Sequence, residues 1–158
     1  MDKFKAGDTA YVIAAWTDNI VKCRIEKKDE DETKGIIYWY EYMNDVDKDG
    51  NDTEKAYGHY GSYENDLYKS AKEAYTAREN KHLERQSQFM AQIRNVEDLM
   101  RFPLDNCFCG EEYTDHDAVI AYKQRTKELM GIDLECVFKP VTEEDECPFL
   151  MENDITER

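Results

Sequence analysis

The sequence has no hydrophobic run long enough to cross a membrane, since no apolar stretch approaches the about 18 residues that a spanning helix needs. Its first residues, Met1 to Lys5, lead into Gly7-Asp8 without the apolar segment of a secretory signal. Five cysteines are an odd number in such a chain, which favours reduced thiols over a disulfide framework. We therefore expect an intracellular, cytoplasmic protein that does not bind membranes.

Positive charge is scarce in two parts of the chain. Residues 29–66 carry 3 Lys or Arg against 12 Asp or Glu, and residues 105–158 carry 5 against 15, within a formal net charge of −15. A protein that binds nucleic acid through phosphates needs clustered Lys and Arg, and acidic blocks repel a duplex. Direct binding of nucleic acid is therefore disfavoured, and a basic protein partner is favoured.

The sequence also lacks a recognisable catalytic constellation. None of the three histidines stands beside a Ser or Cys in a nucleophile context, and His116, between two aspartates, is typical of a helix start. The segment Gly58-His59-Tyr60-Gly61 does not match a phosphate-binding loop, because no helix with a correctly spaced Lys follows it. The sequence predicts a non-enzymatic protein without a cofactor.

Aliphatic residues are few, and aromatic residues replace them. Leu, Ile, Val and Phe number only 29 of 158 residues, which with this net charge approaches the composition of disordered chains. Eleven Tyr, six Met and two Trp supply further apolar surface. We therefore expect a folded chain of about one domain, or of a small module with an appended one.

Alternation of period two predicts strands in the first part of the chain. Residues 20–26 alternate apolar with charged side chains, and residues 36–43 are apolar on both faces, which indicates that both faces are covered. Residues 9–16 and 56–63 are further strands. An acidic loop at 28–35 and an Asp-Gly turn at 44–52 connect them. This pattern predicts a small antiparallel barrel or a curled sheet.

Helical spacing dominates the rest of the chain. Ser70 and Glu73 form a capping box for a helix over 70–100, within which Asn95 is suited to cap a shorter helix at 96–101. A capping pair of Thr114 and Asp117 precedes a helix that ends at Gly131, and residues 132–137 are expected to add a strand. The fold class is thus α+β, a sheet followed by a mainly helical half. We expect the domains 1–68 (sheet), 69–141 (helical region with a terminal strand) and 142–158 (acidic tail).

Two segments resemble the opening and closing of SH3-like small barrels in short proteins of bacteriophages and mobile elements. They are Phe4-Lys5-Ala6-Gly7-Asp8-Thr9-Ala10-Tyr11-Val12-Ile13 and Leu67-Tyr68-Lys69-Ser70-Ala71-Lys72-Glu73-Ala74. The resemblance covers less than half of the chain and implies an SH3-like barrel for its N-terminal part. It assigns no functional residue. In its size and in the clustering of its acidic residues, the chain is also similar, in general character, to the counter-defence and anti-CRISPR inhibitors of bacteriophages.

Two segments leave a metal-binding module open as an alternative. Asp45-x-Asp47-x-Asp49-Gly50 matches the first half of a calcium loop, but Ala56 occupies the position of the bidentate Glu, so a polar hairpin tip is the competing interpretation. Four soft donors are spaced unlike those of a structural zinc site: Cys107, Cys109, His116 and Cys136. A scaffold or dimerisation protein that uses the helix at 70–100 is a third possibility.

The leading hypothesis uses the tyrosines of the predicted strands, which stand beside the two acidic loops. An aromatic patch with carboxylates around it suits a basic, partly apolar partner, whereas the competing interpretation places these rings in the core. The hypothesis is a nucleic-acid mimic that occupies the basic nucleic-acid-binding surface of a host defence protein. Its expected partner-binding residues are Tyr38, Trp39, Tyr40, Asp29, Glu30, Asp31, Glu32, Asp45, Asp47, Asp49, Glu143, Glu144, Asp145 and Glu146.

Overall fold

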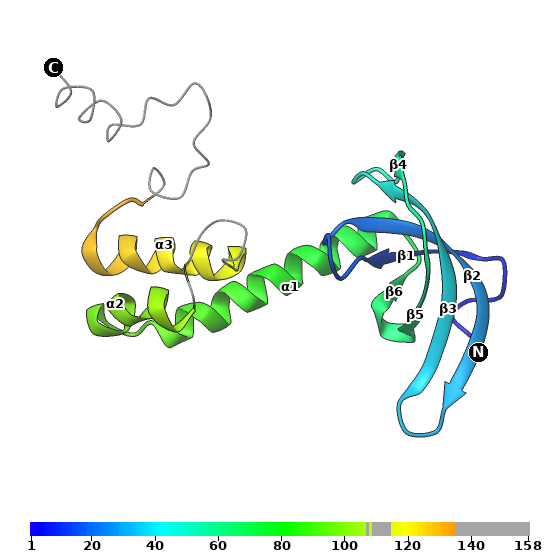
Figure 1. Ribbon diagram of the computed structural model, residues 1–158, viewed down its shortest axis with the longest axis horizontal. Helices are drawn as coiled ribbons and strands as arrows, with labels where there is room; N and C mark the ends of the chain where they lie inside the picture. The colour runs from blue at the N-terminus through cyan, green and yellow to red at the C-terminus, as the bar shows by residue number, and fades with distance from the viewer. Residues whose placement is uncertain (107, 109–114, 135–158) are drawn as a thin grey trace, which may run out of the picture. The chain divides into compact units, whose positions relative to one another are not determined.

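The computed structural model describes residues 1–106, 108 and 115–134, in which an antiparallel sheet is followed by three helices (Figure 1). This is the α+β arrangement that the sequence predicts. Internal contacts divide the chain into a sheet unit, Met1–His82, and a helical unit, Leu83–Arg158. The division falls inside helix α1 (Ala71–Gln92) and not after residue 68, because the first turns of α1 pack on the sheet.

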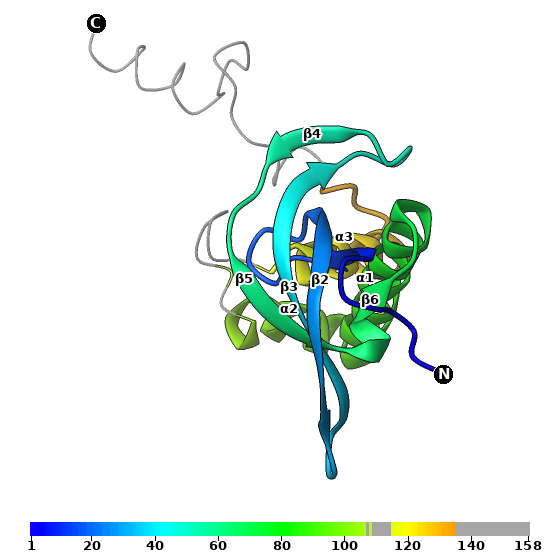
Figure 2. The ribbon, with the colours of Figure 1, turned by 90° about the vertical axis from the view of Figure 1, so that its right-hand side faces the viewer.

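Six strands form one curved antiparallel sheet that is not closed into a barrel (Figure 2). The strands are β1 (Thr9–Ile13), β2 (Ile20–Asp31), β3 (Gly35–Val46), β4 (Asp52–Lys55), β5 (His59–Tyr63) and β6 (Leu67–Tyr68). A short 3₁₀ turn, Glu64–Asp66, separates the last two. The strand order is β4-β3-β2-β1-β6, and β5 pairs with β3 on the same edge as β4. Of the two predicted alternatives, the structure therefore has the curled sheet.

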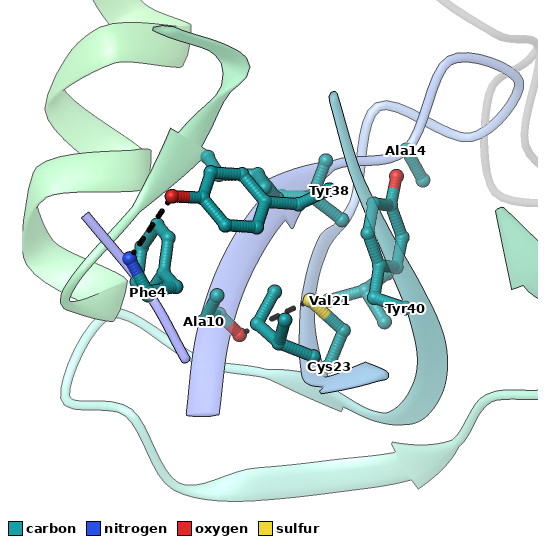
Figure 3. Packing of buried hydrophobic residues seen from close by; sticks show 10 residues of the cluster. Phe4, Ala10, Ala14, Val21, Cys23, Tyr38 and Tyr40 are labelled. Atoms are coloured by element: carbon teal, nitrogen blue, oxygen red, sulfur yellow. Dashed lines mark hydrogen bonds between the residues drawn. The ribbon is translucent and has the colours of Figure 1, made fainter. Parts of the chain in front are cut away.

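The inner face of the sheet carries the main core (Figure 3). Tyr38 is 0% exposed, its ring meets the ring of Phe4 edge-on with centroids 5.5 Å apart, and its hydroxyl accepts a hydrogen bond from the Phe4 backbone N–H at 3.3 Å. Tyr40, 2% exposed, lies on the same face two residues on. The expectation that these two tyrosines anchor a partner is therefore corrected. They fill this core together with aliphatic side chains such as those of Val21, Ile25 and Leu67.

Cys23 lies in this core, where its thiol donates a hydrogen bond to the carbonyl oxygen of Ala10 at 3.4 Å (Figure 3). Burial raises the pKa of the Cys23 thiol to about 12, because the thiolate would lose its hydration. Since the thiolate is the nucleophile, we expect iodoacetamide at mildly alkaline pH to modify Cys23 at least about a hundredfold more slowly in the folded than in the unfolded protein. Pulsed alkylation with mass spectrometry of the Cys23 peptide measures both rates. Equal rates would contradict the burial of this thiol.

Helix α1 begins at the predicted capping box. The Ser70 hydroxyl accepts from the Glu73 backbone N–H at 3.2 Å, and the Glu73 carboxylate accepts from the Lys69 backbone N–H at 3.1 Å. The first turns bury Ala71 and Ala74 in a second cluster of the sheet unit, with Ile20 and Val46. Their small side chains allow the helix to approach the sheet closely.

The helical unit contains the end of α1 together with α2 (Val96–Asp105) and α3 (His116–Met130). The Asn95 side chain accepts from the Asp98 backbone N–H at 2.9 Å and caps α2, which confirms the predicted interruption of the long helix. The predicted end at residue 101 is wrong, because α2 continues through Pro103 to Asp105. The buried core of this unit consists of Ile93, Leu99, Phe102 and Ala118. The Phe102 ring lies within 6.0 Å, centroid to centroid, of three partly buried rings, those of Phe89, Phe108 and Tyr122. Aromatic rings therefore add to the aliphatic packing in this unit.

A capping residue stands at each end of α3. Its N-cap is Asp115, whose carboxylate accepts from the Asp117 and Ala118 backbone N–H groups, so the predicted cap at Thr114 is wrong by one residue. Gly131 ends the helix with a φ of 67°, as predicted. Residues 132–134 form no strand, and the rest of the expected strand and the acidic tail at 142–158 lie outside the described residues. Within the described part of the chain, no helix is long and apolar enough to cross a membrane.

Candidate functional site

An open groove of about 520 Å³ lies on the inner side of the curled sheet. One wall is the loop at 14–19 between β1 and β2, and the other is the segment at 54–62 that contains the end of β4 and most of β5. Val12, Val21 and Tyr40 line it and also belong to the main core. The groove is therefore the place where the core of the unclosed sheet opens to solvent.

Tyrosine rings continue from the core to the outer edge of the groove. The Tyr42 ring lies between those of Tyr40 and Tyr60, with centroid separations of 5.9 and 4.6 Å. Burial raises the pKa values of the Tyr40 and Tyr42 phenols, because the phenolates would lose hydration. The Tyr40 hydroxyl is hydrogen-bonded to the Ser62 hydroxyl at 2.7 Å. At the rim Tyr57 is 74% exposed.

The loop at 14–19 holds Trp16 in solvent, where the residue is 97% exposed. Backbone hydrogen bonds from Ala14 N–H to Asn19 and from Asp18 N–H to Ala14 close the loop. Two side chains of α1 brace it: the Arg78 guanidinium donates to the Asp18 carbonyl at 2.8 Å, and His82 is hydrogen-bonded to the Asp18 carboxylate at 2.6 Å. Trp16 is thus displayed by an ordered loop, and a fully exposed tryptophan is a typical feature of a binding surface.

Two carboxylates and one ammonium group stand along the groove. Asp45 accepts from the Asn19 side-chain amide at 2.9 Å and has no Lys or Arg partner among the described residues. Glu54 is exposed, and within the same part of the chain no ion pair or hydrogen bond of its side chain is found. The Lys55 ammonium lies 5.2 Å from the centre of the Tyr57 ring. The groove therefore combines exposed rings with carboxylates that lack basic partners.

The acidic loop predicted at Asp29 to Glu32 is the end of the β2–β3 hairpin. Asp29 pairs with Lys27 at 3.3 Å and accepts from the Trp39 indole N–H at 2.7 Å, and Glu30 pairs with Lys28 at 2.7 Å. The Asp31 carboxylate accepts from the Thr33 hydroxyl at 2.6 Å, which lowers the pKa of Asp31 and closes the turn. Exposed pairs of this kind contribute little to stability. Asp29 and Glu30 are thus paired with lysines, whereas no ion pair of Asp31 or Glu32 is found among the described residues.

The second acidic turn is a hairpin tip. The Asp47 carboxylate accepts from the backbone N–H groups of Asn51 and Asp49 at 2.9 and 3.0 Å, which lowers the pKa of Asp47. Its oxygens therefore serve the turn itself. Across the residues that the structure describes, no three or more His, Cys, Asp or Glu are grouped to hold a metal ion. The zinc alternative at Cys107, Cys109 and Cys136 lies outside these residues.

Trp39 is separated from the other two expected anchors by the alternation of β3. Its ring, 39% exposed, lies on the outer face over Gly61 of β5, where an added Cβ would be 2.8 Å from the ring. The Lys27 ammonium is 5.5 Å from the ring centre. Trp39 is thus held by its own neighbours, and the groove is on the opposite face.

The structure therefore does not bring the predicted binding residues together in one site. Of these residues, Asp45 and the buried Tyr40 line the groove. Glu143, Glu144, Asp145 and Glu146 lie outside the described residues. Tyr57 belongs to the predicted strand at 56–63 whose tyrosines the hypothesis uses, but neither Trp16 nor Glu54 was expected to bind a partner. Trp16 was expected to end a strand at 9–16, whereas β1 ends at Ile13 and Trp16 lies in the loop that follows.

Comparisons of this chain with protein-family models, with the curated proteins and with the solved structures found no match.

Proposed function

We propose that this chain is a non-enzymatic binding protein whose sheet unit engages a basic, partly apolar surface of another protein. The observation that supports it most is the groove, where the exposed rings of Trp16 and Tyr57 stand beside the carboxylates of Asp45 and Glu54. Tyr and Trp supply large rigid contact areas at interfaces, and unpaired carboxylates select a cationic partner.

The proposed class of partner is a nucleic-acid-binding protein. A surface that binds phosphates is rich in Lys and Arg, and the potential that attracts phosphates also attracts carboxylates. The two acidic turns of the sheet unit, with the net charge of −15, supply such carboxylates. By occupying this surface the chain would exclude the nucleic acid, as an inhibitor of a host defence protein does.

The acidic turns provide a direct test of this function. We expect the triple variant Glu30→Gln, Glu32→Gln, Asp49→Asn to associate with its partner about five- to tenfold more slowly at low salt, because charge on a surface steers encounter. These side chains are exposed, so the substitutions leave folding unchanged. The partner is captured from bacterial lysate on the immobilised protein, eluted by salt or by duplex DNA, and identified by mass spectrometry. Biolayer interferometry with the purified partner then gives the association rates.

A matched control makes the same change of charge elsewhere: Glu79→Gln, Glu84→Gln, Asp105→Asn, all at exposed positions of α1 and α2. The association rate of this control variant should be within about twofold of that of the parent protein. Retention that is indifferent to salt, or equal slowing by both variants, would contradict a specific acidic interface on the sheet unit.

A further inference from the structure

Among the residues that the structure describes, strand β5 forms a free edge of the sheet at the groove. Its one strand neighbour there is β3, with Tyr60 opposite Tyr40 and Gly61 opposite Trp39. In a strand with one neighbour, the N–H and C=O groups of every second residue point away from that neighbour. Three residues of β5, Tyr60, Gly61 and Ser62, also line one wall of the groove, so an added strand on this edge would lie beside the groove.

The other edges of the sheet are protected in ways that β5 is not. Charged side chains and very short strands prevent an edge from pairing with another chain. On the same edge, β4 carries Asp52, Glu54 and Lys55, and the opposite edge is β6, a strand of two residues. The sequence of β5 is His-Tyr-Gly-Ser-Tyr, with no acidic residue, lysine or proline, and four of its five residues are exposed. This strand therefore presents an edge that another chain can extend.

The groove beside β5 specifies the side chains of such an added strand. The Lys55 ammonium lies 5.2 Å from the centre of the Tyr57 ring, and a cationic side chain of a partner would take its place there. Asp45 and Glu54 supply negative charge along the same groove, and Trp16 offers an exposed apolar face. The complementary segment carries an arginine or lysine and an apolar residue on one face.

We infer that a segment of a basic partner protein pairs as an added strand with the free edge of β5. Its cationic side chain lies against Tyr57, Asp45 and Glu54, and its apolar side chain packs on Trp16. Main-chain hydrogen bonds contribute affinity in this mode, and alternate side chains contribute specificity. The inference rests on the proposed function for the basic character of the partner and adds the place and the geometry of binding.

A defined peptide tests the inference without knowledge of the partner. The probe is fluorescein-labelled Thr-Leu-Thr-Arg-Thr-Leu-Thr-Arg, which as a strand has threonine on one face and leucine with arginine on the other. Fluorescence anisotropy with the full chain measures its affinity. We expect at least about fivefold weaker binding when citrulline replaces arginine, or in Tyr57→Ala or Glu54→Gln protein, and unchanged binding in Glu79→Gln protein. The three replaced side chains are exposed, so urea unfolding of the variants should match that of the parent protein.

Two backbone-methylated probes isolate the pairing itself. One carries N-methyl groups on its threonines, and the other carries them on leucine and arginine. Because only every second N–H of an added strand points toward β5, one of these peptides should lose at least about tenfold in affinity while the other binds like the parent peptide. Equal affinity of all three peptides would overturn strand pairing, and a parent peptide that does not bind would overturn the groove as its site.

The experiments distinguish a failure of the inferred strand pairing from a failure of the proposed function. If the peptide fails to bind but the Glu30, Glu32 and Asp49 substitutions still slow association with a basic protein, the inference falls and the proposed function stands. If the peptide binds as expected but no basic protein is retained by the chain, the proposed function falls, and the groove is a site for short extended segments.

Discussion

Replacement of Tyr38 by alanine is expected to lower the free energy of unfolding of the sheet unit by about 3 to 5 kcal/mol, because it removes a fully buried ring from the core. The ring has 0% exposure, and its hydroxyl is the acceptor for the Phe4 backbone N–H. Against a total stability of about 5 to 15 kcal/mol for a typical domain, this loss is large. Urea unfolding followed by tryptophan emission measures it, since both tryptophans, Trp16 and Trp39, belong to the sheet unit.

The conservative variant Tyr38→Phe separates the ring from its hydroxyl. It retains the edge-on contact with Phe4 and removes only the acceptor of one buried N–H, which should cost about 1 kcal/mol. A Tyr38→Ala protein as stable as the parent would show that this ring is not a core residue, and would restore it as a candidate anchor.

Replacement of Phe102 by alanine should cost the helical unit about 3 to 5 kcal/mol, because this ring is the centre of the aromatic cluster. Circular dichroism at 222 nm during urea unfolding follows the helices, while tryptophan emission follows the sheet unit. We expect the helical signal to unfold at a lower urea concentration and the midpoint of the emission change to stay nearly constant.

Leu104, in the same helix, provides the control. It is 81% exposed, so Leu104→Ala should change stability by less than about 0.5 kcal/mol. If Phe102→Ala lowered both midpoints equally, the two units would unfold as one cooperative body, contrary to the division of contacts at His82 and Leu83.

Local signals predicted most of the elements. The capping box at Ser70 and Glu73, the cap at Asn95 and the stop at Gly131 all occur as expected, because the groups that make them are within a few residues of one another. The residue patterns located β1, β2, β3 and β5 but not the short strands β4 and β6, and the expected strands at 9–16 and 56–63 are shorter in the structure. They also underestimated β2 and β3, whose polar ends pair with each other up to Asp31 and Gly35. Hydrogen bonds between the two strands hold these polar ends in the sheet, and the residue pattern of one strand alone cannot predict such pairing.

The candidate site was predicted less well. Aromatic and acidic residues were expected at the site, but two of the expected aromatic anchors, Tyr38 and Tyr40, are buried in the core. The exposed rings of the groove, Trp16 and Tyr57, are 41 positions apart in the chain. Neither lies in the most strongly predicted strand, at residues 36–43. They line one groove only because the sheet curls and β5 returns along β3.

The sequence by itself determined the α+β class, the order of sheet and helices, the caps at Ser70 and Asn95, the stop at Gly131 and the acidic character of the two turns. Each of these depends on neighbours along the chain or on composition. The tertiary structure alone decided which tyrosines are buried, that the sheet stays open, and that β5 presents its free edge beside a groove with Trp16, Asp45 and Glu54. These features depend on the curvature of the sheet and on which strand edges are hydrogen-bonded to another strand. Both are set by contacts between segments that are distant in the sequence.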